Sequence, residues 1–176
     1  MANEDAQAAL DDANVLLELA PGLALAKLRK AEANMMLSNW EEAKDDLEQI
    51  VEDSPHHHHA LTQLASCFMA MDRPEKAEAP LNEALRLAPD HTEAWHQRGL
   101  LYLDWAQEES ALNDFEAAVR CDGNHLGARL RIAAIHHEAK RFPEALGAWN
   151  GVLAIEPEHT VARRRREECE MALATI

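Results

Sequence analysis

The feature that most constrains the fold of this chain is a pattern of small and aromatic residues that recurs every 34 residues. The pattern is most complete in residues 92–125, where three residues at helical spacing mark one face of a first helix and three more mark one face of a second. These six residues are Trp95, Gly99, Tyr102, Ala111, Phe115 and Ala118. Two helices that face each other predict a hairpin, and a hairpin repeated along 176 residues predicts an all-α solenoid.

Small residues recur at two positions of this period, which indicates that the two helices of each hairpin cross closely. One set belongs to the second helices: Ala9, Ala43, Ala77, Ala111 and Ala145. The other belongs to the first helices: Ala31, Ala65, Gly99 and Ala133. We therefore expect all of these residues to be packing residues.

Residues 92–125 resemble a tetratricopeptide repeat (TPR), whose pattern is W-x2-L-G-x2-Y, then A-x3-F, then P. Arg98 replaces the leucine of that pattern and Gly123 replaces the proline. The resemblance implies a right-handed superhelix in which the first helices line a concave groove for peptides or for a helix of a partner.

The period divides the chain into four whole repeats with one additional helix at each end. We expect a single TPR domain over residues 1–176, with an N-terminal helix (half repeat) at 5–20, repeats at 24–57, 58–91, 92–125 and 126–159, and a C-terminal capping helix at 160–175. The half repeat is either a lone capping helix or the remainder of a longer array. Because this helix leaves one face unpaired, the sequence leaves self-association through the half repeat open.

Some residues depart from the repeat pattern. In the first repeat Lys27, Lys30 and Asn34 stand at apolar positions, so either this helix is poorly covered or the lysine stems pack while their amines reach water. Pro74 suits the beginning of a second helix, whereas Pro80 lies further inside and is expected to bend it.

Composition excludes several classes of partner. The net charge of -15 argues against generic binding to nucleic acid or to anionic lipid. No apolar stretch is long enough to span a bilayer, and no secretory signal is recognisable, so we expect a cytoplasmic protein without membrane insertion. The run Arg163–Arg166 either forms a patch that binds an acidic partner or simply lies on the solvent-exposed side of the capping helix.

Residues that could carry chemistry have simpler interpretations. The run His56–His59 lies at a turn where successive side chains diverge, so we expect no metal site there. The histidines that recur with the repeat are better explained by turn packing than by metal binding: His57, His91, His125 and His159. Cys67, Cys121 and Cys169 are expected to be small buried hydrophobic residues. We therefore expect no catalysis, no cofactor and no metal.

The first helices also present a face that points away from the second helices. The residues that we expect to line a peptide-binding groove on this face are Leu28, Arg29, Met35, Gln63, Met69, His96, Gln97, Leu100, Leu103, Leu130, Arg131 and Ala134. Exposed leucine and methionine favour an apolar or amphipathic ligand. Alternatively, Leu100 and Leu103 merely pack between neighbouring hairpins.

These observations predict a protein–protein interaction scaffold or adaptor that binds a peptide or an amphipathic helix. One alternative is a small acidic TPR chaperone for an exported protein, and another is a non-catalytic TPR segment of a larger protein. TPR domains that grip the carboxylate end of chaperones use lysine, asparagine and arginine at set positions. Here those positions hold Leu28, Glu32 and Gln63, or Thr62, Ser66 and Gln97 one repeat later, so that ligand is not expected.

Overall fold

A computed structural model describes residues 2–175, which form ten α-helices and one short 3-10 helix, with no strand in that range. The predicted all-α fold class is therefore confirmed. The chain divides into two compact units, Met1–Pro89 and Asp90–Ile176. The right-handed superhelix and the repeat boundaries stay predictions.

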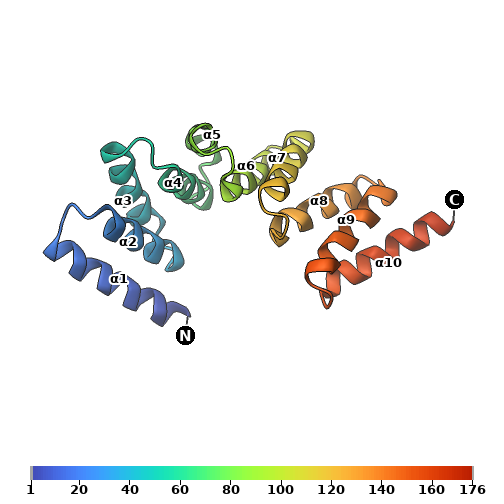
Figure 1. The fold of residues 1–176 in the computed structure, drawn as a ribbon, viewed down its shortest axis with the longest axis horizontal. Coiled ribbons are helices and arrows are strands. Elements are labelled where there is room, and N and C mark those ends of the chain that lie inside the picture. Colours follow the sequence, from blue (N-terminus) through green and yellow to red (C-terminus); the bar gives the residue numbers. More distant parts are fainter. Residues whose placement is uncertain (1, 176) are drawn as a thin grey trace. The chain divides into compact units, whose positions relative to one another are not determined.

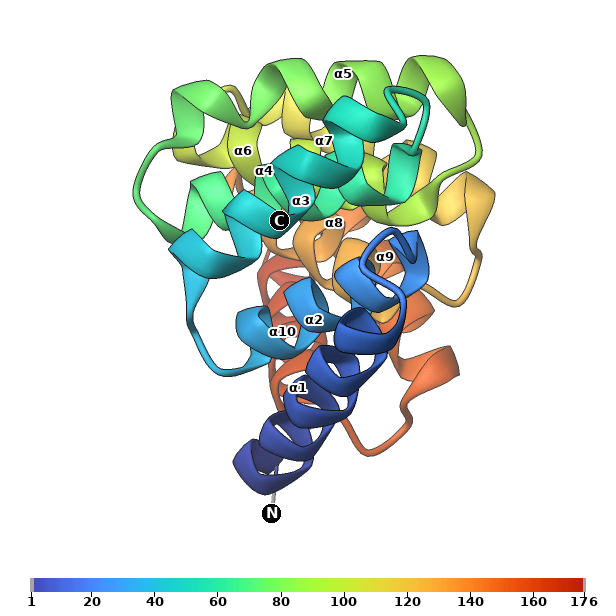
Figure 2. The same ribbon diagram turned by 90° about the vertical axis from the view of Figure 1, so that its left-hand side faces the viewer.

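Unit 1 consists of consecutive helices that each pack against the next along the chain (Figure 1). Its elements are α1 (Ala2–Leu19), α2 (Ala24–Met36), α3 (Trp40–Asp53), α4 (His58–Ala70), the 3-10 helix η1 (Pro74–Lys76) and α5 (Glu78–Leu87). Helix α1 lies along one side of α2 at the edge of the unit (Figure 2).

Unit 2 is built in the same way. Its elements are α6 (Thr92–Asp104), α7 (Glu108–Cys121), α8 (Leu126–Glu138), α9 (Phe142–Ile155) and α10 (Thr160–Ala174). The hairpins α6–α7 and α8–α9 contact each other through α7 and α8, and α10 packs against α9. No helix of the described residues is long and apolar enough to cross a membrane.

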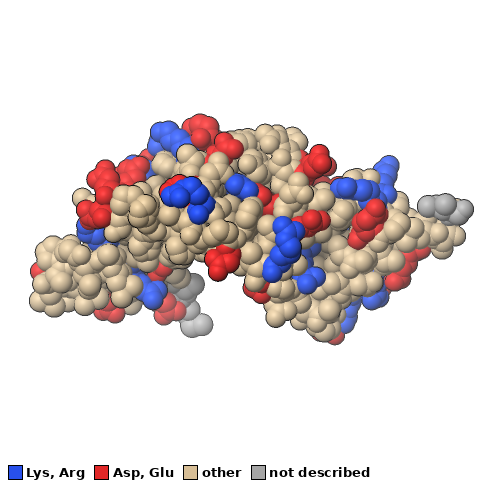
Figure 3. All heavy atoms as spheres, turned by 45° about the horizontal axis from the view of Figure 1, so that its top comes forward, with Lys and Arg blue, Asp and Glu red and all other residues tan. Residues whose placement is uncertain are grey.

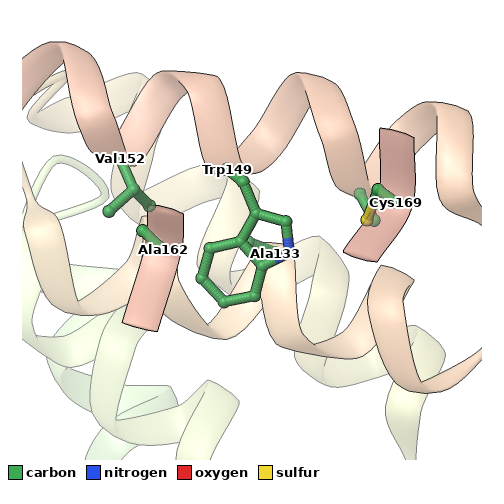
Figure 4. Close-up of a cluster of buried hydrophobic side chains, with 6 residues drawn as sticks. Ala133, Trp149, Val152, Ala162 and Cys169 are labelled. Atoms are coloured by element: carbon green, nitrogen blue, oxygen red, sulfur yellow. The ribbon is translucent and has the colours of Figure 1, made fainter. Parts of the chain in front are cut away.

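The recurring small residues lie where the two helices of each hairpin cross. Both sets are buried as predicted, apart from Ala9, which is exposed. Gly99 shows why these positions hold small residues, because a Cβ atom added there would lie 2.7 Å from Cε1 of Phe115. In the last hairpin Trp149 fills the same place and packs with Val152, Ala133 and Ala162 (Figure 4).

The turn inside each hairpin has one residue in the left-handed region, and these residues are also spaced by 34 positions. Their φ angles are 62° at Ser38, 58° at Asp72, 55° at Ala106 and 57° at Lys140. The next residue donates its N–H to a carbonyl five positions back, as Gln107 does to Tyr102 at 2.8 Å. This is the Schellman termination of a helix, made here without glycine.

The recurring histidines begin the first helices. The Nδ1 atoms of His57, His125 and His159 accept hydrogen bonds from the backbone N–H groups three residues later, at 3.0–3.1 Å. His91 is the N-terminal cap of α6 at the equivalent position. The pattern therefore has a structural cause, since an acceptor at this position satisfies an otherwise unpaired donor.

Three local expectations need correction or completion. Pro80 lies in the first turn of α5, where its missing N–H is not needed, because the segment begins as η1 and the α-helix starts only at Glu78. Lys27 and Lys30 do not simply reach water: each amine binds a carboxylate of α3 at 3.0 Å, on Asp53 and Asp46 respectively. Cys121 is exposed because it is the last residue of α7.

Candidate functional site

None of the predicted groove residues is buried. Arg29 and Arg131 are exposed, and the other groove residues are half-buried. In unit 1, Glu32 joins two of them, because Arg29 donates to Glu32 Oε2 at 2.9 Å and Gln63 donates to Glu32 Oε1 at 3.3 Å. These contacts link the groove faces of α2 and α4 within unit 1.

Unit 2 holds a pocket of about 420 Å³, a size within the range of ligand pockets. Four residues of the predicted groove lie on its wall. The full lining is His96, Gly127, Leu130, Arg131, Ala134, Trp149, His159 and Val161. The wall is mainly apolar, and Arg131 is its one fully charged side chain.

Gly127 opens this pocket. The equivalent positions of the other first helices carry Leu25, His59, Glu93 and Val161, so position 127 alone lacks a side chain. A Cβ atom at Gly127 would lie 3.2 Å from Nε2 of His96. A glycine in the first turn of a helix, on the predicted groove face, is the sequence signal that could have located the pocket.

Leu100 and Leu103 belong to a different environment. Both pack against a buried cluster that includes Phe115 of α7 and Ala128 and Ile135 of α8. This packing supports the alternative in which they fill the space between neighbouring hairpins. A part of each side chain remains accessible.

A polar cluster borders the pocket at His96. Gln97 donates to Glu93 Oε1 at 2.6 Å, and the rings of His96 and His125 lie 4.8 Å apart. Burial alone would raise the pKa of the Glu93 carboxyl. The interactions with His96 and Gln97, together with nearby His125, outweigh that effect and lower its pKa below the ordinary value.

The same cluster is the group of the described residues that comes nearest to a metal site, since ligand atoms of Glu93, His96 and His125 lie within 4.8 Å of one another. However, Nδ1 of His125 accepts the N–H of Ala128, so the proton of a neutral ring resides on Nε2, the atom that faces Glu93 at 3.8 Å. A metal at Nε2 would require the other tautomer and break the cap. The geometry therefore favours a hydrogen-bonded cluster.

Two of the three thiols, those of Cys67 and Cys169, are poorly suited to act as nucleophiles. Burial raises the pKa of Cys67 to about 11. The pKa of Cys169 is also raised, mainly by burial and to a smaller extent by the negative charge of Glu168. Both are protonated near neutral pH and inaccessible. Charged groups of both signs are interspersed on the face that Figure 3 shows, with wide uncharged areas between them.

Paired helices with a 34-residue period, small residues at each crossing and an accessible first-helix face define an α-helical repeat protein of the interaction type. Sequence profiles of tetratricopeptide repeats match residues 36–99 and residues 92–125, which together span half of the chain. The chain belongs to the tetratricopeptide repeat family. No curated protein sequence matches it.

Solved structures share the fold at low sequence identity. A thermophilic TPR protein of Thermus thermophilus, TTC0263, is 20% identical, with 94% of this chain and 91% of that chain covered and a TM-score of 0.78. YrrB, a TPR protein with an unusual peptide-binding site, is 22% identical (93% and 84% covered, TM-score 0.70). The first TPR of Spaghetti (RPAP3), bound to the HSP90 peptide SRMEEVD, is 22% identical (66% and 93% covered, TM-score 0.63).

Proposed function

We propose that this chain is a non-catalytic interaction module, and that the pocket of unit 2 receives an apolar side chain of a peptide or of a partner's amphipathic helix. The observation that carries the proposal is the pocket itself, whose apolar wall of Leu130, Ala134 and Val161 lies beside the exposed guanidinium of Arg131. An acidic residue next to the inserted side chain would pair with that guanidinium.

The energetics favour such a ligand. Val161 is 45% exposed, and removing apolar surface of this kind from water stabilises a complex by about 25 cal/mol per Å². His96 and His159 are polar groups at the wall and fix orientation more than they add affinity. The ligand chemistry is therefore one apolar anchor with a neighbouring carboxylate.

Similarity to YrrB and to the first TPR of Spaghetti supports a peptide ligand in general terms, because both are peptide-binding proteins of this fold. It does not extend to the chaperone tail. The positions where that specialisation uses lysine, asparagine and arginine hold Leu28, Glu32 and Gln63, none of which carries a positive charge, and Glu32 is already bound by Arg29.

A selection from a random peptide library tests the proposal. Peptides that bind the unaltered chain should be enriched in an apolar residue beside aspartate or glutamate. Arg131→Glu should reverse the preference from acidic to basic neighbours, because the charge at the wall is inverted. Since Arg131 is exposed, helicity and melting should stay unchanged.

Arg120→Glu is the matched control, because Arg120 is exposed on α7 and is not part of the pocket wall. It should leave the selected peptides unaltered. A library that yields the same peptides with Arg131→Glu as with the unaltered chain would exclude the pocket as the binding site.

A further inference from the structure

The large apolar side chains that remain exposed occur only near the two ends of the described chain. They lie on α1, on α2 with the loop before it, and on α10: Val15, Leu16, Leu19, Leu23, Leu25, Met36, Val161 and Met171. Among the described residues of α3 to α9 there is none. Exposed apolar groups gathered in this way mark interaction surfaces.

Helix α1 aligns with the second helices of the repeats. Its exposed face is the one that a first helix covers in the complete hairpins. Ala9 is exposed, whereas Ala43 and the other residues at its position in the four hairpins are fully buried. Leu16 is 46% exposed, whereas the equivalent Ile50 is 1% exposed. Within the described residues, no first helix covers this face.

Helix α10 has the complementary register, that of a first helix. Ala162 is buried at the position that Ala26 and Ala128 occupy in complete hairpins. The side of α10 that would face a second helix carries Arg166, which is only half-buried, and its Nε atom has no hydrogen-bond partner. This atom lies 3.5 Å from a carboxylate oxygen of Glu170 on the same helix.

We propose that α10 of one copy docks on α1 of a second copy, so that the two helices complete a hairpin head to tail. In two complete hairpins, an ion pair already joins the positions that would meet between the docked helices. Lys30 binds Asp46 at 3.0 Å and Arg98 binds Asp114 at 2.7 Å, at positions that differ by multiples of 34 residues. The same positions in the two end helices are Arg166 and Asp12.

Contacts between consecutive first helices extend this complementarity. Gln63 of α4 donates to Glu32 of α2, and the corresponding residues at the docked ends are Arg29 and Glu168, which carry opposite charges and would add this contact to the ion pairs that each already makes within its own chain. His125 and Glu93 contact each other in unit 2, and at the docked ends Leu23 and Val161 hold the equivalent positions. Both of these side chains are exposed, so docking would bury an apolar pair.

One position distinguishes the docked hairpin from the complete ones. Glu167 occupies the position that Ala133 and Gly99 hold in complete hairpins. Its larger side chain would crowd two helices that cross as closely as the helices do there. The facing residue on α1 is Ala13, which is smaller than the leucine, phenylalanine or tryptophan of the complete hairpins but is itself only 1% exposed. The association is therefore weaker than the packing within a hairpin, and Glu167→Ala should strengthen it.

An interface made by two different surfaces is heterologous, so association continues beyond a dimer unless a ring closes. Sedimentation of the unaltered chain from about 1 µM to about 1 mM should show an average mass that rises above the 19.7 kDa monomer. Asp12→Arg and Arg166→Asp should each weaken self-association at least about tenfold. Arg120→Asp, on α7, is the matched control and should not.

A mixture of the two charge-reversed variants gives the decisive readout. In the mixture, the reversed α1 face of the Asp12→Arg chain fits the reversed α10 face of the Arg166→Asp chain, and the two unaltered faces fit each other, so only the pairing of a variant with itself repels. An equimolar mixture should therefore regain the self-association that each variant alone has lost. A single monomeric species over the whole concentration range for the unaltered chain would overturn the proposal, and so would self-association that neither substitution weakens.

Discussion

Gly99 and Phe115 face each other where α6 crosses α7, and the distance between them leaves no room for a side chain at position 99. A Cβ atom added to Gly99 would lie 2.7 Å from Cε1 of Phe115, which is itself fully buried. We expect Gly99→Ala to lower the free energy of unfolding by about 1–3 kcal/mol, as other overpacked cores do. Urea unfolding measures this change directly.

Gly147 provides the control for this substitution. It lies within α9, is exposed, and has no heavy atom within 4 Å of an added Cβ. Because alanine forms helices better than glycine, Gly147→Ala should raise the free energy of unfolding by about 0.5–1 kcal/mol. If Gly99→Ala were stabilising as well, the close crossing would not be the reason for the glycine.

Burial of individual residues was predictable where a close crossing forces the same residue type at every repeat. Ala43, Ala77, Ala111 and Ala145 are all fully buried for that reason. The prediction for Cys121 was wrong, because it rested on the helical period alone. Cys121 is the last residue of α7, and whether a helix end is covered depends on the path of the following loop.

At the scale of the helix, charged residues take the place of the apolar contacts that the repeat pattern requires. Arg98 stands at the leucine position of the pattern, and its guanidinium makes two hydrogen bonds to Asp114, at 2.7 and 2.8 Å. It also stacks on the ring of Trp95, 4.9 Å from its centroid. Sequence alone left this helix face unexplained, because the acid that completes it lies 16 residues away on another helix.

Removal of Asp114 should therefore destabilise the chain. Asp114 is 4% exposed, and Asp114→Ala would leave the guanidinium of Arg98 largely buried without its carboxylate. We expect a loss of about 3–5 kcal/mol in the free energy of unfolding, measured by urea titration.

The double substitution Arg98→Leu with Asp114→Leu is the matched comparison. It removes both charges together, so its effect on stability should be close to zero or favourable. A double variant as unstable as Asp114→Ala alone would show that shape at this position, rather than charge, governs the stability of the hairpin.

Helix ends were less predictable than helix faces. The turns at Ser38, Asp72, Ala106 and Lys140 adopt left-handed geometry without the glycine that signals such turns. The contacts between the helices hold these turns, and a short sequence window does not contain that information. For the same reason, the position of Pro80 in the first turn of α5 became evident only from the structure.

At the scale of the whole molecule, the groove face was predictable and the pocket was not. His96, Leu130, Arg131 and Ala134 were expected on one face because helical spacing fixes that face. The pocket also needs Trp149 from α9 and Val161 from α10. The cavity arises from the combination of these helices, and Gly127 contributes no side chain that would fill it.

Every residue that lines the pocket belongs to unit 2, which leads to a prediction about the chain as an array of hairpins. In a repeat protein, stability is a sum of hairpin and neighbour terms, so a fragment with whole hairpins can fold. We expect residues 90–176 alone to show a helical circular dichroism spectrum, to unfold cooperatively, and to bind the peptides selected with the intact chain.

A fragment of residues 108–176 tests whether whole hairpins are required. It begins at α7 and lacks α6, so Phe115 and Ala111 lose the helix that covers them. Without that cover, α7 should lose much of its helicity, and the loss of His96 should weaken peptide binding, because His96 lies on α6 and lines the pocket. If residues 90–176 were unfolded under conditions in which the intact chain folds, the division into two units would not be one of independent stability. The fold of unit 2 would then depend on the preceding hairpins.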